Sequence, residues 1–122
     1  MRPALRLLCA LLPWVALGCD DAGPAQLAAS VDGDAAAVLV ELMGEGITGV
    51  ESVGGTRALG AAGPTPGTYR VVLVAPVSGL LRFQVNVRDG SRPPPTGRVL
   101  EASDGGNQPR GVSGLTVRVE GS

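Results

Sequence analysis

The apolar runs of this chain are short and are separated by glycine and proline, which limits the folds that the chain can adopt. From residue 35 onward, short runs rich in β-branched residues alternate with clusters of glycine and proline. The chain holds 19 Gly and 10 Pro, and both residues disfavour helix interiors while fitting tight turns. No helical period of apolar residues runs through this part of the chain. The sequence therefore predicts an all-β domain made of short strands.

The clearest strand lies in residues 81–88. Every second residue there is apolar, and the residues between are polar or charged. A period of two is typical of a strand with one face on a core and one in water. The apolar set, which we expect in the core, is Leu81, Phe83, Val85 and Val87. A similar alternation in residues 115–120 predicts the last strand.

Other strands are expected where apolar runs end at Gly or Pro. Residues 69–75 are the most hydrophobic run, which predicts burial on both faces. Pro76 to Gly79 is expected to form a turn, so that residues 69–87 form a hairpin. Residues 35–43 leave a short helix as an alternative because Ala, Leu, Glu and Met favour helices, but Val38 and Val40 favour a strand. The remaining predicted strands are 47–53, 56–59 and 99–102.

This pattern indicates an antiparallel β-sandwich of six or seven strands over residues 35–122. Residues 60–68, 91–97 and 103–111 read as loops by composition. Residues 20–34 are rich in Ala, Gly, Asp and Ser, a composition typical of a flexible linker. The predicted division is a signal segment (1–18), an anchor and linker (19–34), and the sandwich (35–122).

The N-terminus has the layout of a secretory signal peptide. Arg2 and Arg6 precede an apolar stretch over residues 7–17 that only Pro13 interrupts. The stretch is shorter than the roughly 20 residues that a membrane-spanning helix needs. We therefore expect export and removal of residues 1–18.

The end of this leader resembles the bacterial lipoprotein signal. In that family a small residue precedes a Cys that is diacylated and becomes the new N-terminus, which here implies cleavage after Gly18 and lipidation of Cys19. The family prefers a branched aliphatic residue three positions before the Cys, where this chain has Ala16. Cys19 is the only Cys beyond the leader, so no intrachain disulfide is open to it. The alternative is a plain secretory leader that leaves a free thiol at Cys19.

Several phrases of the domain are similar to cohesin-like modules, a class of bacterial extracellular β-sandwiches. They are AVLVEL at residues 37–42, the segments 46–50 and 69–87, and the closing VLEASD at residues 99–104. The resemblance implies an Ig-like sandwich fold and an exported setting. It carries over no dockerin ligand, because cohesins proper are longer.

Missing residue types narrow the chemistry. The chain has no His and no Lys, which removes the usual neutral-pH general base, the commonest metal ligand and the Schiff-base amine. We therefore expect a non-enzyme without cofactor or metal. All 11 acidic residues follow Gly18, whereas two of the 10 basic residues, Arg2 and Arg6, precede it. A mildly acidic domain without a basic block also argues against nucleic-acid binding.

Weaker candidate sites have simpler structural explanations. Carboxylate pairs are open in principle, but strand alternation predicts solvated positions for Glu41, Glu45, Glu51, Glu101 and Glu120. Asp32–Asp34 and Asp104–Asn107 offer the oxygen ligands that calcium prefers, but turn chemistry explains the same residues. If their strands are neighbours, Arg82, Arg88 and Arg118 would form a cationic patch for a polyanionic glycan, although solvated strand faces carry Arg routinely. The loop around Pro93–Pro95 reads as a stiff connector or a polyproline ligand.

The expected function is that of a lipid-anchored, non-enzymatic sandwich module with a binding or structural role at the cell envelope. Its expected partners are the membrane, through the anchor at Cys19, and an envelope protein or glycan. We expect a monomer. The alternative is an accessory subunit of an envelope enzyme or secretion complex.

Overall fold

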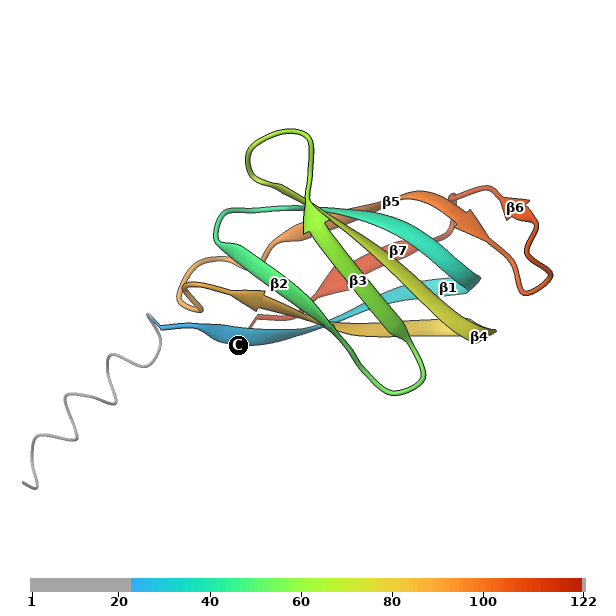
Figure 1. The fold of residues 1–122 in the computed structure, drawn as a ribbon, viewed down its shortest axis with the longest axis horizontal. Coiled ribbons are helices and arrows are strands. Elements are labelled where there is room, and N and C mark those ends of the chain that lie inside the picture. Colours follow the sequence, from blue (N-terminus) through green and yellow to red (C-terminus); the bar gives the residue numbers. More distant parts are fainter. Residues whose placement is uncertain (1–22, 122) are drawn as a thin grey trace, which may run out of the picture.

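The computed structural model describes residues 23–121, so Gly18 and Cys19 lie outside the described part. Within it the chain is all-β, with every strand pair antiparallel (Figure 1). This confirms the predicted fold class of an antiparallel β-sandwich. The strands are β1 (Ala25–Met43), β2 (Ile47–Ser52), β3 (Arg57–Ala62), β4 (Thr68–Val87), β5 (Thr96–Ser103), β6 (Pro109–Arg110) and β7 (Thr116–Val119).

Two long strands organise the sandwich. β1 and β4, of 19 and 20 residues, pair along most of their length and pass together from one layer into the other. The β2 layer contains β2, the second half of β4, the first half of β1, and β7. The β3 layer contains β3, the first half of β4, the second half of β1, β5 and β6. β2 contacts β3 and β5 contacts β7, which brings the two layers together along both sides.

The passage between layers occurs at an irregular segment of the β1–β4 ladder. Register shifts lie between Val31 and Ala37, and Gly33 there adopts a φ of +132°. The shift changes which positions of β1 face inward, from Leu27, Ala29 and Val31 to Val38, Val40 and Leu42. An irregularity of this kind lets one strand direct side chains into the core from both layers.

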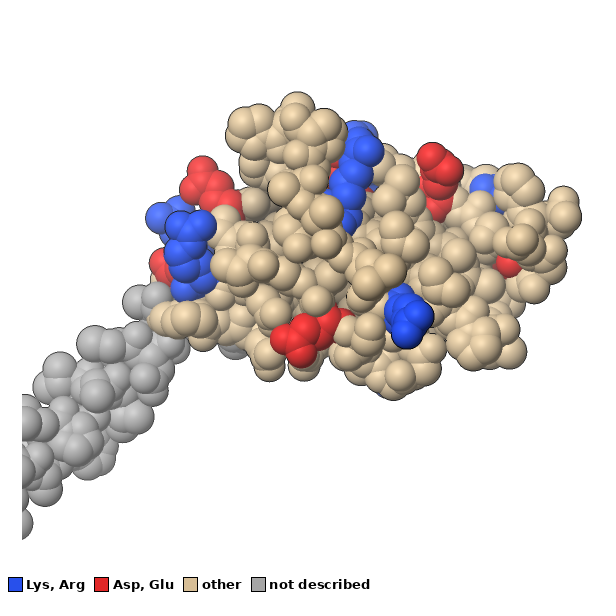
Figure 2. All heavy atoms as spheres, viewed as in Figure 1, with Lys and Arg blue, Asp and Glu red and all other residues tan. Residues whose placement is uncertain are grey.

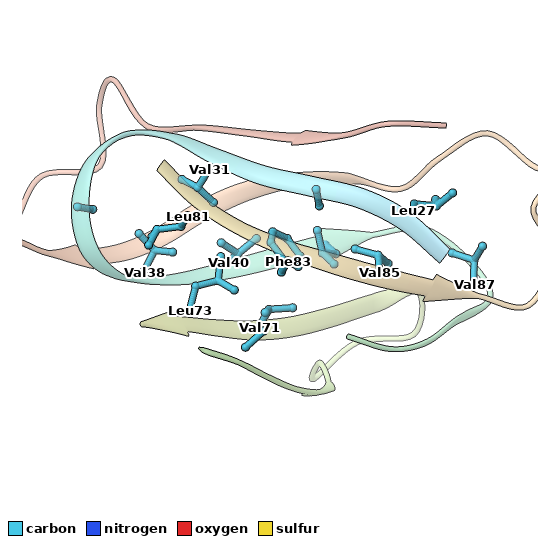
Figure 3. Packing of buried hydrophobic residues seen from close by; sticks show 14 residues of the cluster. Leu27, Val31, Val38, Val40, Val71, Leu73, Leu81, Phe83, Val85 and Val87 are labelled. Carbon is cyan, nitrogen blue, oxygen red and sulfur yellow. The ribbon is translucent and has the colours of Figure 1, made fainter. Parts of the chain in front are cut away.

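The core lies between the layers (Figure 3). Phe83 is the largest of its fully buried side chains, and Leu81, Val85 and Val87 are buried beside it. This confirms the alternation predicted for residues 81–88. Full burial of such a side chain contributes about 1.5–3 kcal/mol.

The predicted linker is wrong for residues 25–34, which belong to β1. Leu27 pairs with Val85 and Val31 with Leu81, and both β1 side chains are buried in the core. Small Ala and Ser residues between them lowered the apparent hydrophobicity of the segment. The folded domain therefore begins about ten positions before the predicted boundary at residue 35.

The predicted hairpin over residues 69–87 is also wrong, because these residues form the single strand β4. Both halves pair with β1 instead of with each other, and the β1–β4 ladder skips residues 75–78. Pro76 therefore stands where no ladder N–H is required, which a strand tolerates. Residues 60–62 extend β3 into a predicted loop, and β6 occupies part of another.

Candidate functional site

The outward surface of the β3 layer carries an apolar patch. Val72 on β4 lies opposite Leu59 on β3 and Leu39 on β1. Val74 and Ala37 pair in the neighbouring row. The side chains of Leu59, Val72 and Val74 are 65%, 41% and 44% exposed. We call these five residues the apolar face.

The apolar face corrects the prediction that residues 69–75 are buried on both faces. Val71 and Leu73 point into the core and are fully buried, whereas Val72 and Val74 point outward and are exposed. Each layer of a sandwich has only its inner face covered. The outward valines are apolar surface beyond what the core uses, and contiguous surface of this kind is typical of interaction sites.

A shallow groove of about 270 Å³ continues from the apolar face toward β5 and β6. Leu39 and Val72 line it together with Glu101, Asn107 and Pro109. The turn at its border is held by Asp104, whose Oδ1 accepts from the N–H groups of Gly106 and Gln108 at 2.9 and 3.0 Å. Asn107 takes a left-handed φ of 63° in this turn. Asp104 and Asn107, considered as calcium ligands, therefore build the turn.

An ion cluster borders the apolar face on its other side. The Glu41 carboxylate on β1 accepts from Arg98 Nε and Nη2 on β5 at 3.2 and 3.0 Å, and from Arg70 Nη2 on β4 at 3.5 Å. The Glu41 side chain is only 8% exposed. The sequence predicted a solvated position, which is wrong because the two arginines cover the carboxylate. The cluster joins three adjacent strands of the β3 layer.

The other four glutamates have different surroundings. Glu45 forms an ion pair with Arg92, and Glu51 accepts from Gln26 and Asn86. Glu101 lines the groove, and Glu120 follows the end of β7. Among residues 23–121, no group of three or more His, Cys, Asp or Glu side chains is placed to hold a metal ion.

The outward surface of the β2 layer is mainly polar, and Leu80 on β4 is its one large apolar side chain with high exposure among the described residues of the layer, at 47%. Arg82 on β4 and Arg118 on β7 both lie opposite Ser30 on β1, so the structure brings two of the three predicted arginines to one face. Arg118 Nη2 lies 3.4 Å from Asp32 Oδ2, and this ion pair reduces the combined positive charge of Arg82 and Arg118. Asp32, considered as a calcium ligand, serves this ion pair. Arg88 lies at the end of the domain, beyond β4.

That end of the domain, where β1 begins, holds a pocket of about 510 Å³. We call it the tether-end pocket because the anchor expected at Cys19 precedes β1 in the sequence. Its charged lining residues are Glu45, Arg88, Asp89 and Arg92, and Tyr69 also lines it. Arg92 lies 3.7 Å from Glu45 and 3.6 Å from Asp89. The Arg88 guanidinium forms no hydrogen bond or ion pair with any residue that the structure describes.

Asp89 is held in place by its own loop. Its Oδ1 accepts from the Ser91 hydroxyl at 2.6 Å and from the Ser91 N–H at 2.9 Å. These bonds, together with the nearby Arg92 charge, hold the pKa of Asp89 below its usual value of 3.8. The carboxylate is therefore ionised at neutral pH.

Comparisons of the chain with protein families, curated proteins and solved structures find no significant match. The resemblances to lipoprotein signals and cohesin-like modules therefore stay predictions. Across residues 23–121 there is no helix long and apolar enough to cross a membrane.

Sequence reasoning missed the apolar face, the Glu41 cluster and the tether-end pocket. The sequence does hold a signal for the apolar face. Val72 and Val74 occupy alternate positions of residues 69–75, the run for which burial on both faces is predicted. The other two depend on strand pairing between distant segments.

Proposed function

We propose that this chain is an exported, lipid-anchored, non-enzymatic β-sandwich module that binds a protein of the cell envelope through its apolar face. The anchor is a lipid on Cys19 after cleavage behind Gly18. The domain that follows contributes an interaction surface and carries out no chemistry of its own.

The anchor is supported by the sequence of the leader. Gly18-Cys19 follows a short basic region and an apolar stretch, and Cys19 has no partner for an intrachain disulfide. Each buried methylene contributes about 0.8 kcal/mol, so two acyl chains suffice for stable anchoring. A lone exposed thiol in an oxidising compartment would otherwise be reactive.

The observation that carries the binding role is the contrast between the two outward faces. The β2 layer presents polar residues such as Gln26, Glu51 and Asn86, joined by hydrogen bonds. The β3 layer presents Leu59, Val72 and Val74 to solvent. One apolar face beside a groove fits a protein partner better than a glycan, because sugars are recognised by hydrogen bonds and aromatic platforms that this face does not supply.

Metabolic labelling with a fatty-acid probe tests the anchor. We expect label on the wild-type chain and its loss in Cys19→Ala. Label that persists in Cys19→Ala, or that never enters the wild type, contradicts lipidation at this position.

Site-specific photo-crosslinking in cells tests the binding face. A photoreactive residue in place of Leu59 should give a discrete protein adduct, and Val72→Asp should abolish it. The matched control is the same photoreactive residue in place of Thr116, an exposed position on the β2 layer. Equal adducts from both positions, or none from either, would contradict a binding role for the apolar face.

A further inference from the structure

The early start of β1 leaves little chain between the proposed anchor and the folded domain. Cys19 and Gly23 are four positions apart, and the Gly23 carbonyl accepts from the Gly90 N–H at 2.9 Å. Even fully extended, four residues span about 14 Å. A lipid on Cys19 therefore holds the end of the sandwich that carries Gly23 close to the bilayer surface.

Two connections flank Gly23 at this end. Figure 1 shows the turn between β1 and β2 and the loop between β4 and β5 at the same end of the domain as the start of β1. The turn between β1 and β2, the loop between β4 and β5 and the loop before β4 line the tether-end pocket. Figure 2 shows basic and acidic side chains gathered at the same end.

We propose that this end docks on the bilayer and that Arg88, with Arg92, binds the phosphate of a phospholipid headgroup. The inference rests on the proposed lipid anchor. Arg88 has no carboxylate partner among the described residues, and the two contacts of Arg92 are longer than hydrogen bonds. A guanidinium offers five N–H donors in a planar fork that matches phosphate oxygens. Both arginines therefore keep donors for a phosphate.

The shape and remaining lining of the pocket suit a headgroup. Its volume of about 510 Å³ lies within the range of small-ligand sites. Tyr69 lines it. Tyrosine is favoured at membrane interfaces, where its ring contacts apolar groups and its hydroxyl contacts water. Backbone groups of the neighbouring turn are already paired, since Gly44 N–H donates to Gly67 O and Arg88 N–H to Gly46 O. The polar side chains that line the pocket, foremost the Arg88 guanidinium, are the groups that we expect to contact a ligand.

The charge balance defines how this contact works. Glu45 and Asp89 offset the charges of Arg88 and Arg92, so the pocket exerts little long-range attraction on an anionic membrane. Binding then depends on the anchor, because a short tether raises the effective concentration of headgroups to about the millimolar range. The contact orients an anchored domain, and an unanchored domain does not bind.

Fluorescence quenching measures this orientation. Trp14 of the leader is the only Trp in the chain, so a Trp introduced into the exported part is a single reporter. We would place it at Pro93→Trp, in the loop beside the pocket, and separately at Val77→Trp, at the exposed bend of β4. The lipidated chain, purified from membranes, is reconstituted in phosphatidylcholine vesicles that contain lipids with a nitroxide on the headgroup.

The proposal predicts several-fold stronger quenching at position 93 than at position 77. Arg88→Gln in the Pro93→Trp background should reduce the quenching markedly, without release from the vesicles. The matched control is Arg82→Gln, which changes an exposed arginine within β4 that, like Arg88, has no ion pair in the described part of the chain, and it should change nothing. Equal quenching at both positions, or equal effects of the two arginine variants, would overturn the proposal.

Fatty-acid labelling of the same preparation separates this failure from failure of the proposed function. A chain without label overturns both the anchor and the docking. A labelled chain with equal quenching at both positions overturns the docking alone. Circular dichroism of each variant shows whether the strand content is retained, so that loss of quenching is not loss of fold.

Discussion

Arg98 on β5 donates two hydrogen bonds, from Nε at 3.2 Å and Nη2 at 3.0 Å, to Oε1 of Glu41 on the neighbouring strand β1. Arg70 on the opposite side of β1 approaches the other carboxylate oxygen. The cluster thus connects β4, β1 and β5 at the border of the apolar face. The cluster buries the Glu41 charge on the outward side of a layer, where the alternation of the strand alone predicts a side chain in contact with water.

Replacement of Glu41 should destabilise the domain. Glu41→Ala leaves two arginines without their acceptor. Breaking a fully buried ion pair in this way lowers the free energy of unfolding by about 3–5 kcal/mol. Because both arginines are partly exposed, we expect a smaller loss of about 1–2 kcal/mol. Urea unfolding measures the change in free energy. The control Glu101→Ala, an exposed glutamate of β5, should alter stability by less than about 0.5 kcal/mol. Equal effects of the two would show that the cluster does not stabilise the fold.

Leu27 tests the placement of residues 25–31 in the core. Leu27→Ala should lower the free energy of unfolding by about 2–4 kcal/mol, because it removes a buried side chain and leaves a cavity. The control Gln26→Ala changes the adjacent outward side chain and should cost much less, since it loses one exposed hydrogen bond. A negligible effect of Leu27→Ala would restore the reading of this segment as a flexible linker.

Gly60 tests the packing between β2, β3 and β4. A Cβ at this position would lie 2.6 Å from Tyr69 Cε2 and 2.8 Å from Val50 Cγ2. Gly60→Val should therefore cost about 1–3 kcal/mol through overpacking. Gly55→Ala, in the open turn between β2 and β3, meets no atom within 4 Å and should be nearly neutral. Similar thermal stability of the two variants would contradict this packing.

Asp89 gives a pH dependence of defined sign. Its pKa is lower in the folded chain than in the unfolded one, mainly because the Ser91 hydroxyl donates to the carboxylate. The stabilisation is thus fully present above the unfolded pKa and is lost as the pH falls through the folded pKa. Asp89→Asn should be less stable than the wild type at neutral pH, and the difference should shrink in strong acid. A difference that does not vary with pH would exclude this linkage.

Parts of the fold followed from local pattern. The alternation from Leu81 to Val87 identified the inward face of a strand, because that signal depends only on neighbouring residues. The first half of β1 was missed because Ala29 and Ser30 dilute the same alternation around Leu27 and Val31. The turn predicted at Pro76 to Gly79 is wrong because composition does not show that the strand continues beyond Pro76 and pairs with β1 on both sides of it.

The candidate sites depended on pairing that the sequence does not show. Glu41 is buried by Arg70 and Arg98, which are 29 and 57 positions away along the chain. The apolar face exists because β3, β4 and β1 align Leu59, Val72 and Leu39 in one row. Each residue alone reads as an ordinary strand residue, and only the register turns the three into a surface.

The proposed function requires that the domain be tethered to a membrane, and the mass of the mature N-terminal peptide measures whether it is. We expect the chain isolated from the membrane fraction to begin at Cys19 and this residue to carry a diacylglyceryl group. A mature chain that retains residues 1–18, or that begins near residue 19 with an unmodified thiol, would contradict it.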